Sequence, residues 1–149
     1  MRNVLAGILA CVVATSVYAQ TPIQDGTIQK GEYSITDTQS GITIAASLSK
    51  DGSTLYMAVS AATAGWVSFG VGSPRMNGSY MIFGFQKSDG VRVISEETGK
   101  GHSHSPNNKS MATAFITEMN GVTTLEAAFP ATGFIKAGIL DVIAAMGKR

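Results

Sequence analysis

Cysteine is almost absent from this chain of 149 residues, in which Cys11 is the single example. Cys11 lies in an apolar N-terminal stretch that is expected to be removed. The remaining chain then has no thiol, which excludes disulfides, thiolate metal sites, a cysteine nucleophile and covalent c-type haem attachment. Any metal or cofactor would have to be held by other side chains.

The first nineteen residues have the layout of a secretory signal peptide. A basic start at Arg2 precedes an apolar run over Val4–Val13 and a small-residue end at Val17-Tyr18-Ala19. This layout predicts cleavage after Ala19 and a bacterial protein that is periplasmic or secreted. Alternatively, the stretch "ILAC" is a lipoprotein cleavage site, which would leave Cys11 as an acylated N-terminus. No later segment has about eighteen consecutive apolar residues, so we expect no membrane span in the mature chain.

An excess of charge of either sign is also lacking. Eleven basic residues face ten acidic ones, and removal of Arg2 leaves the two numbers equal. A neutral chain without a basic stripe is a poor match for nucleic acid or for an anionic membrane surface. We therefore expect neither as a partner.

The common catalytic motifs are missing too. The chain has no phosphate-binding glycine loop and no G-x-S-x-G nucleophile elbow. The acidic residues are few, and Glu96 and Glu97 are adjacent, which on a strand sends them to opposite faces. We do not expect this protein to be an enzyme.

What the chain does have is a series of short alternating segments with frequent glycine. From Gly31 to Arg149, turn signals recur every eight to twelve residues, which is typical of an all-β sandwich or barrel. Segments 42–49 and 53–60 alternate apolar with polar residues around a turn at Lys50-Asp51-Gly52. A second hairpin is predicted at Asn120-Gly121, and segment 139–146 reads as a last apolar strand.

Two further strands enclose a short break. "GWVSFGVG" (65–72) places Val67, Phe69 and Val71 on one face, and "SYMIFGFQ" (79–86) has an alternating set that we assign to the core, namely Met81, Phe83 and Phe85. Residues 96–110 have no apolar periodicity and are predicted to form a long polar loop, which is often functional or disordered.

The break between those strands contains Met76, within the triplet Met-Asn-Gly. The same triplet recurs at Met119, where an ordinary two-residue hairpin turn accounts for it. At Met76 the additional residues Ser73-Pro74-Arg75 lengthen the loop. Its thioether either fills a gap at the surface or serves as a soft ligand to iron or copper.

Three other groups of side chains are candidates for a site. His102 and His104 lie two residues apart, on one side of an extended segment, and are either solvated or ligands to copper, zinc or haem iron. Trp66 is either a core residue or a wall of a pocket for a flat macrocycle or a sugar ring. Tyr80 lies on the face opposite Phe83 and fits either description.

The ordered set "GWVSFGVG", "RMNGSYMIFGF", "DGVRVI", "GHSH", "NGVTTLEAAFP" and "ILDVIAAMGKR" resembles the DOMON domain family. The resemblance covers residues 41–149, after an N-terminal segment and first strand at 20–40. It implies an immunoglobulin-like antiparallel β-sandwich that binds either haem b, without covalent bonds, or a carbohydrate. In the haem-binding branch a methionine from the loop after the "GW" strand is one axial ligand, and Met76 stands there.

The resemblance also implies a histidine ligand shortly after the late apolar strand. The chain reads Met146-Gly147-Lys148-Arg149 there, so that histidine and the last strand of the family's sandwich are lacking. Three explanations are open: the chain is a truncated product, the protein does without that ligand, or His102 or His104 replaces it as the second ligand.

Three functions remain open at this stage. The first is an exported single-domain haem b protein that transfers electrons to or from a redox partner protein. The second is a non-catalytic module that binds a carbohydrate or a protein, with Trp66 and Tyr80 as its platform. The third is a periplasmic copper-binding protein that uses His102, His104 and methionine.

Overall fold

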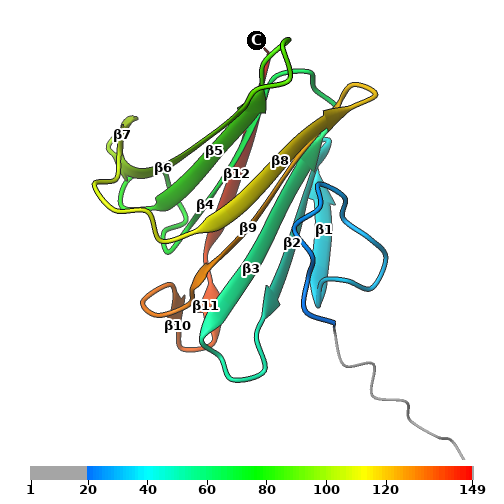
Figure 1. Cartoon of the computed structure of the whole chain (residues 1–149). Helices are drawn as coiled ribbons and strands as arrows, with labels where there is room; N and C mark the ends of the chain where they lie inside the picture. Colours follow the sequence, from blue (N-terminus) through cyan, green and yellow to red (C-terminus); the bar gives the residue numbers. More distant parts are fainter. Residues whose placement is uncertain (1–19, 149) are drawn as a thin grey trace, which may run out of the picture.

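Two five-stranded antiparallel sheets pack face to face in the computed structural model, which describes residues 20–148 (Figure 1). This part of the chain contains no helix, and the predicted all-β antiparallel sandwich is confirmed. The predicted signal peptide, with Cys11, and the terminal Arg149 lie outside the described residues.

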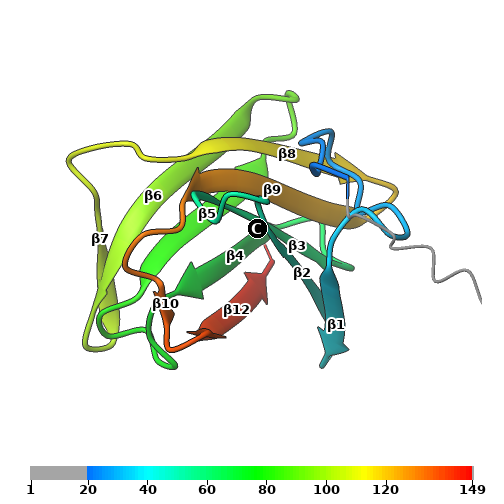
Figure 2. The same cartoon turned by 90° about the horizontal axis from the view of Figure 1, so that it is seen from below.

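The first sheet has the strand order β1-β2-β3-β9-β8 and the second sheet has the order β12-β4-β5-β6-β7 (Figures 1 and 2). The strands of the first sheet are β1 (Ile35–Gln39), β2 (Ile42–Leu48), β3 (Thr54–Ala61), β8 (Thr113–Met119) and β9 (Val122–Pro130). Those of the second sheet are β4 (Trp66–Val71), β5 (Tyr80–Gln86), β6 (Arg92–Lys100), β7 (Ser103–Pro106) and β12 (Val142–Gly147). A small hairpin of β10 (Ile135–Lys136) and β11 (Ile139–Leu140) precedes β12.

Both predicted hairpin turns are confirmed. β8 and β9 are joined by Asn120 and Gly121 alone, with φ of 54° and 76°, the backbone that a primed two-residue turn requires. Gly52 closes the β2–β3 turn with φ of 74°. In that turn, hydrogen bonds from the Ser49 hydroxyl and from Ser53 lower the pKa of Asp51 to about 2.

The core lies between the sheets. Alternate residues of β3 and β4 fill it as predicted, and the rings of Phe69 and Phe129 stack across it with centroids 6.1 Å apart. Each large apolar side chain buried here contributes about 1.5–3 kcal/mol through removal of its surface from water. The fully buried members include Met57, Val59, Val67, Phe69, Val71, Ile82, Ile116 and Leu125.

The predicted inward face of β5 is wrong. Tyr80 and Ile82 face the core, whereas Met81, Phe83 and Phe85 point to the outer face of the second sheet. Both faces of β5 carry apolar side chains, so alternation alone does not distinguish the inside from the outside. The outer face of the second sheet therefore carries a set of apolar side chains.

The predicted polar loop at residues 96–110 is also wrong in part. β6 continues to Lys100, and β7 pairs with it as the edge strand of the second sheet. Polar strands at a sheet edge lack apolar alternation, which is why the pattern missed them. The expectation that Glu96 and Glu97 lie on opposite faces of the strand is confirmed, because Glu96 bonds to core-facing Tyr80 and Glu97 to His104 of β7.

The predicted last strand at 139–146 is divided in two. Asp141 interrupts it, and its carbonyl accepts a hydrogen bond from the amide of Gly72 at 3.1 Å. The part after Asp141 forms β12, which pairs in register with β4 from Val142 opposite Val71 to Gly147 opposite Trp66.

The segment before β1 crosses the outer face of the first sheet and is attached there by Glu126 of β9. The carboxylate of Glu126 is fully buried and accepts hydrogen bonds from the amide of Gly26 at 2.6 Å and the hydroxyl of Tyr33 at 2.7 Å. Burial raises the pKa of Glu126 above its usual range, and burial also raises the pKa of Tyr33.

Exchange of Glu126 for glutamine should make stability less dependent on pH. Because the folded state raises the pKa of Glu126, the protonated form is favoured in the fold, so stability is highest below the ordinary value of 4.5. It is lost as pH rises through the raised pKa, by about 1.4 kcal/mol for each unit of the shift. We expect the free energy of unfolding of the wild type, minus that of Glu126→Gln, to fall as pH increases in urea titrations. A difference that stays level across this range would contradict the assignment.

Candidate functional site

The outer face of the second sheet carries a cavity of about 470 Å³. This volume lies within the usual range for small-molecule and cofactor sites. Its walls come from β4, β5, β12, β7 and the loop between β4 and β5, and they are mainly apolar. The lining residues are Trp66, Ser68, Phe69, Gly70, Met76, Met81, Phe83, Phe85, His104, Ile143, Ala144 and Ala145.

Met76 is half-buried and lines this cavity from the β4–β5 loop. The carbonyl of Met76 accepts hydrogen bonds from the hydroxyl and the amide of Ser79, at 2.8 and 3.1 Å. The loop is also attached to β6, where the amide of Gly78 donates to the carbonyl of Gly99 at 3.0 Å. The side chain of Met76 is therefore presented by a hydrogen-bonded loop rather than by a free surface segment.

Gly99 allows this close approach. A Cβ atom built on Gly99 would lie 1.7 Å from the carbonyl oxygen of Met76, a distance that no side chain tolerates. The absence of a side chain at this one position of β6 lets the loop backbone rest on the strand. Gly99 thus positions Met76 although it does not line the cavity itself.

His104 reaches the same cavity from β7. Its ring stacks on the ring of Phe83, with centroids 4.7 Å apart and planes inclined by 26°. Its Nδ1 atom is hydrogen-bonded to the carboxylate of Glu97. His104 keeps 40% of its side chain exposed, so the imidazole stands at the rim of the cavity.

His102 does not share this position. It lies exposed in the turn between β6 and β7 and is not among the residues that line the cavity. The prediction that both imidazoles lie on one side assumed an extended segment through both histidines. β7 begins only at Ser103, so His102 lies outside the strand. Of the two candidate histidines, the structure brings only His104 together with Met76.

An aromatic wall runs along one side of the cavity. Phe83 lies between His104 and Trp66, whose ring centroid is 5.6 Å from that of Phe83. The indole lies against β12 at Gly147, where an added Cβ would be 2.3 Å from the indole nitrogen. Such a wall suits a flat, largely apolar ligand.

Ser68 supplies the one buried side-chain nitrogen or oxygen atom without a hydrogen-bond partner in the described part of the chain. The residue is 2% exposed and lines the cavity, and its hydroxyl oxygen makes no hydrogen bond with any of the described residues. An unsatisfied buried hydroxyl costs about 1–3 kcal/mol. A ligand with a polar atom in the cavity would remove that cost.

Tyr80 lies elsewhere. It is buried against Phe129 and Phe134, each with its ring centroid 5.3 Å away, and its hydroxyl donates to Glu96 at 2.5 Å. Burial raises the pKa of Tyr80. Because Tyr80 faces the core and Trp66 faces the outside, the two do not form the single platform that the sequence suggested.

Several residues that line or support the cavity were not recognised from the sequence. Phe83 was assigned to the core, and Glu97 and Gly99 were placed in a loop. Once β6 is recognised as a strand, its register places Glu97 opposite Met81, on the cavity face of the sheet. That pairing is a long-range property, and no local pattern in residues 96–110 reveals it.

Within residues 20–148, no group of three or more histidine, cysteine, aspartate or glutamate side chains could hold a metal ion. Metal binding in the cavity would therefore depend on thioether sulfur together with His104. Met76 and Met81 are the two methionines that line it, and Met81 is 3% exposed.

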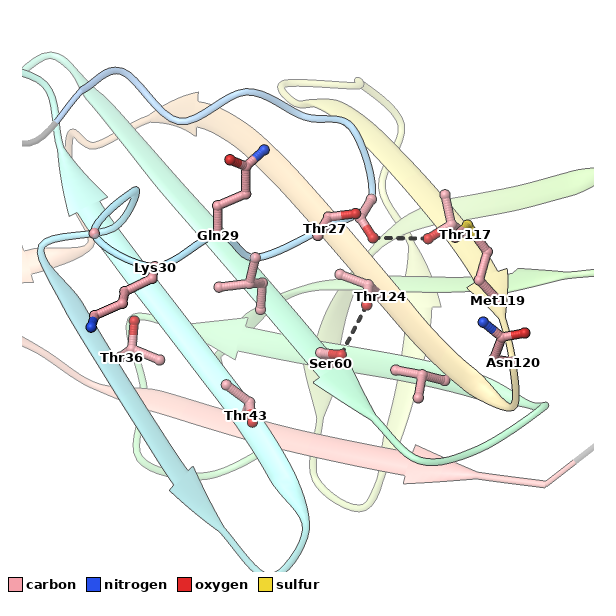
Figure 3. Close-up of a pocket in the computed structure, with 14 residues that line it drawn as sticks. Thr27, Gln29, Lys30, Thr36, Thr43, Ser60, Thr117, Met119, Asn120 and Thr124 are labelled. Carbon is pink, nitrogen blue, oxygen red and sulfur yellow. Dashed lines mark hydrogen bonds between the residues drawn. The ribbon is translucent and has the colours of Figure 1, made fainter.

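A second, larger hollow of about 740 Å³ lies on the outer face of the first sheet, beside the N-terminal segment (Figure 3). A row of hydroxyl side chains crosses all five strands here, each directly opposite the next: Thr38, Thr43, Ser60, Thr124 and Thr117. Their hydroxyls are already paired, Thr38 with Thr43, Ser60 with Thr124 and Thr117 with the carbonyl of Gly26. No aromatic ring or imidazole lines this hollow, so the row reads as cross-strand stabilisation of the sheet.

No protein-family model matches the chain, and no curated protein matches it either. In residues 20–148 no helix is long and apolar enough to cross a membrane.

Proposed function

We propose that this protein binds one haem b without covalent bonds in the cavity on the second sheet, with Met76 and His104 as ligands to iron, and that it transfers electrons. The observation that supports this most is the convergence of a thioether and an imidazole on one apolar cavity, although the two residues come from different segments of the chain. The resemblance to the haem-binding branch of the DOMON family points to the same methionine.

The residues present fit haem in three respects. The aromatic rings of Trp66 and Phe83 suit a flat macrocycle, and the unpartnered hydroxyl of Ser68 suits a polar atom of a ligand. Thioether and imidazole together are an established donor set for haem iron in electron-transfer proteins. When bound, haem would supply a one-electron redox couple, whose potential a methionine ligand raises.

The protein's own residues would then exclude water and hold the ligands. The apolar side chains from β5 and β12 cover the cavity, the hydrogen-bonded loop presents Met76, and Phe83 supports the ring of His104. With two protein ligands no coordination site is left for a substrate, so we propose electron transfer to or from a partner protein rather than catalysis. The N-terminal layout supports export to the periplasm or the medium as the place of this exchange.

A copper site is the second candidate function. It is favoured by Met81, because Met76, Met81 and His104 line one cavity and such a set of soft ligands suits Cu(I). In this case the cavity would hold a single ion rather than a macrocycle, and the aromatic wall would only shield it from solvent.

Titration of the purified protein with haemin and, separately, with Cu(I) distinguishes the two. We expect a saturable Soret band at one haem per chain in the wild type and in Met81→Leu, because leucine keeps the volume of the cavity. Copper coordination would instead depend on Met81, and Met81→Leu would weaken it. Saturable Cu(I) binding that Met81→Leu weakens, together with no saturable haem binding, would replace the haem proposal with the copper one.

A further inference from the structure

Glu97 contacts His104 at the Nδ1 atom of the imidazole and leaves the Nε2 atom free of this contact. Its carboxylate bonds to Nδ1 of His104 and also accepts a hydrogen bond from the hydroxyl of Ser95 at 2.7 Å. The side chain of Glu97 is only 12% exposed, whereas that of His104 is 40% exposed. We propose that Glu97 is a positioning residue that prepares His104 to bind iron through Nε2 and lowers the reduction potential of the bound haem.

The tautomer of the imidazole is the first part of this role. A carboxylate accepts hydrogen bonds, so Nδ1 of His104 must carry the proton that it donates to Glu97. In the neutral ring the proton is then missing from Nε2, which leaves a lone pair there for a metal. Glu97 thus selects the ligand atom before any metal arrives.

Orientation is the second part. Ser95 and Glu97 belong to β6, and they hold the ring of His104 from β7, while Phe83 of β5 supports its face. Three neighbouring strands of the second sheet therefore restrict the rotation of one imidazole. A ligand held in this way loses less entropy when it binds than a histidine on a mobile loop.

The electronic effect is the third part, and it rests on the proposed function. A carboxylate partner increases the basicity of a ligating histidine and stabilises the more positive oxidation state of the metal. This acts against Met76, whose thioether raises the potential. The effects of Glu97 and Met76 on the reduction potential are opposite in sign. Together they would give a potential between the value with only the carboxylate effect and the value with only the thioether effect.

Glu96 supplies a matched control, because it is the adjacent carboxylate on the opposite face of the same strand. It accepts hydrogen bonds from Tyr80 and Met111 and makes none with His104. Glu97→Gln keeps a hydrogen-bond acceptor but removes the charge, and Glu97→Leu removes both. Glu96→Gln removes the same charge at nearly the same place.

In redox titrations of the haem complexes, we expect the midpoint potential to rise from wild type to Glu97→Gln and further to Glu97→Leu. Haem affinity should fall by about 10- to 100-fold in Glu97→Leu, as is typical for loss of an outer-shell partner of a metal ligand. Glu96→Gln should leave both quantities close to those of the wild type. Equal shifts in the Glu96 and Glu97 variants would mean a general effect of charge and would overturn the proposal.

A measurement without haem separates this inference from the proposed function. Long-range proton–nitrogen NMR spectra of the haem-free protein report which nitrogen of His104 carries the proton. We expect the Nδ1-protonated form in the wild type and its loss in Glu97→Leu, with His102 unchanged. If the wild type binds no haem but shows this pattern, only the haem proposal fails; if His104 has the same tautomer in both proteins, the role of Glu97 is refuted.

Discussion

His104→Ala should convert the haem complex from a low-spin form with two protein ligands to a high-spin form. The imidazole is the one nitrogen ligand that lines the cavity, and alanine leaves no donor in its place. Absorption spectra of the oxidised and reduced complexes would report the change, and haem affinity should fall by more than about 100-fold, beyond the range seen for outer-shell partners.

His102→Ala is the matched control for this experiment. It removes the same side chain two residues away, from an exposed turn that does not line the cavity. Its spectrum should be that of the wild type. A low-spin spectrum that survives in His104→Ala but not in His102→Ala would mean that His102 is the ligand and would contradict the assignment of His104.

Met76 can be tested in the same way, because the chain repeats its triplet. Met119 also precedes an Asn-Gly dipeptide, but it is 62% exposed at the end of β8. Met76→Ala should abolish the low-spin spectrum, whereas Met119→Ala should leave it unchanged. Identical spectra for both variants and the wild type would remove Met76 from the site.

Gly99→Ala should displace Met76, although Gly99 itself does not line the cavity. The added methyl group would meet the backbone of the β4–β5 loop at 1.7 Å, so either the loop or β6 must move. Such overpacking typically costs about 1–3 kcal/mol. We expect a lower free energy of unfolding together with loss of the methionine ligand from the haem spectrum.

Gly101→Ala provides the comparison. No atom lies within 4 Å of a Cβ built on Gly101, although its φ of 62° favours glycine. We expect a loss of stability of about 1–2 kcal/mol from the left-handed backbone and an unchanged haem spectrum. If Gly99→Ala also leaves the haem spectrum unchanged, the contact between β6 and the loop does not position Met76.

Much of the fold could be predicted from local patterns. Alternation in β2 and β3 identified the core face, since Ile42, Ile44 and Ala46 pack on the core and Leu55, Met57 and Val59 lie in it. The Asn-Gly dipeptide at residues 120–121 predicted its hairpin because few residues adopt the positive φ that the turn needs. These features depend on neighbours in sequence.

The errors occurred where a strand is apolar on both faces or polar throughout. β5 has Tyr80 and Ile82 on one face and Phe83 and Phe85 on the other, so hydropathy does not choose between them. The second half of β6, from Glu96 to Lys100, and all of β7 were missed because their polar side chains resemble a loop. In each case the pairing of distant strands decided the outcome.

The candidate site was predictable in the types of side chain that line it but not in its geometry. Met76 was recognisable as a methionine in a long loop, and the two histidines as candidate ligands. The direction of Met76 depends on Gly99, and the choice of His104 over His102 depends on where β7 begins. Both features depend on how distant segments of the chain pair, so the spacing of residues in the sequence does not predict them.

The most direct test of the central claim is the near-infrared magnetic circular dichroism spectrum of the ferric haem complex, in which the position of the charge-transfer band identifies the axial ligands. We predict the band of methionine–histidine ligation in the wild type and its loss in both Met76→Ala and His104→Ala. A bis-histidine band, or a high-spin spectrum in the wild type, would contradict the assignment of Met76 and His104 as the two ligands.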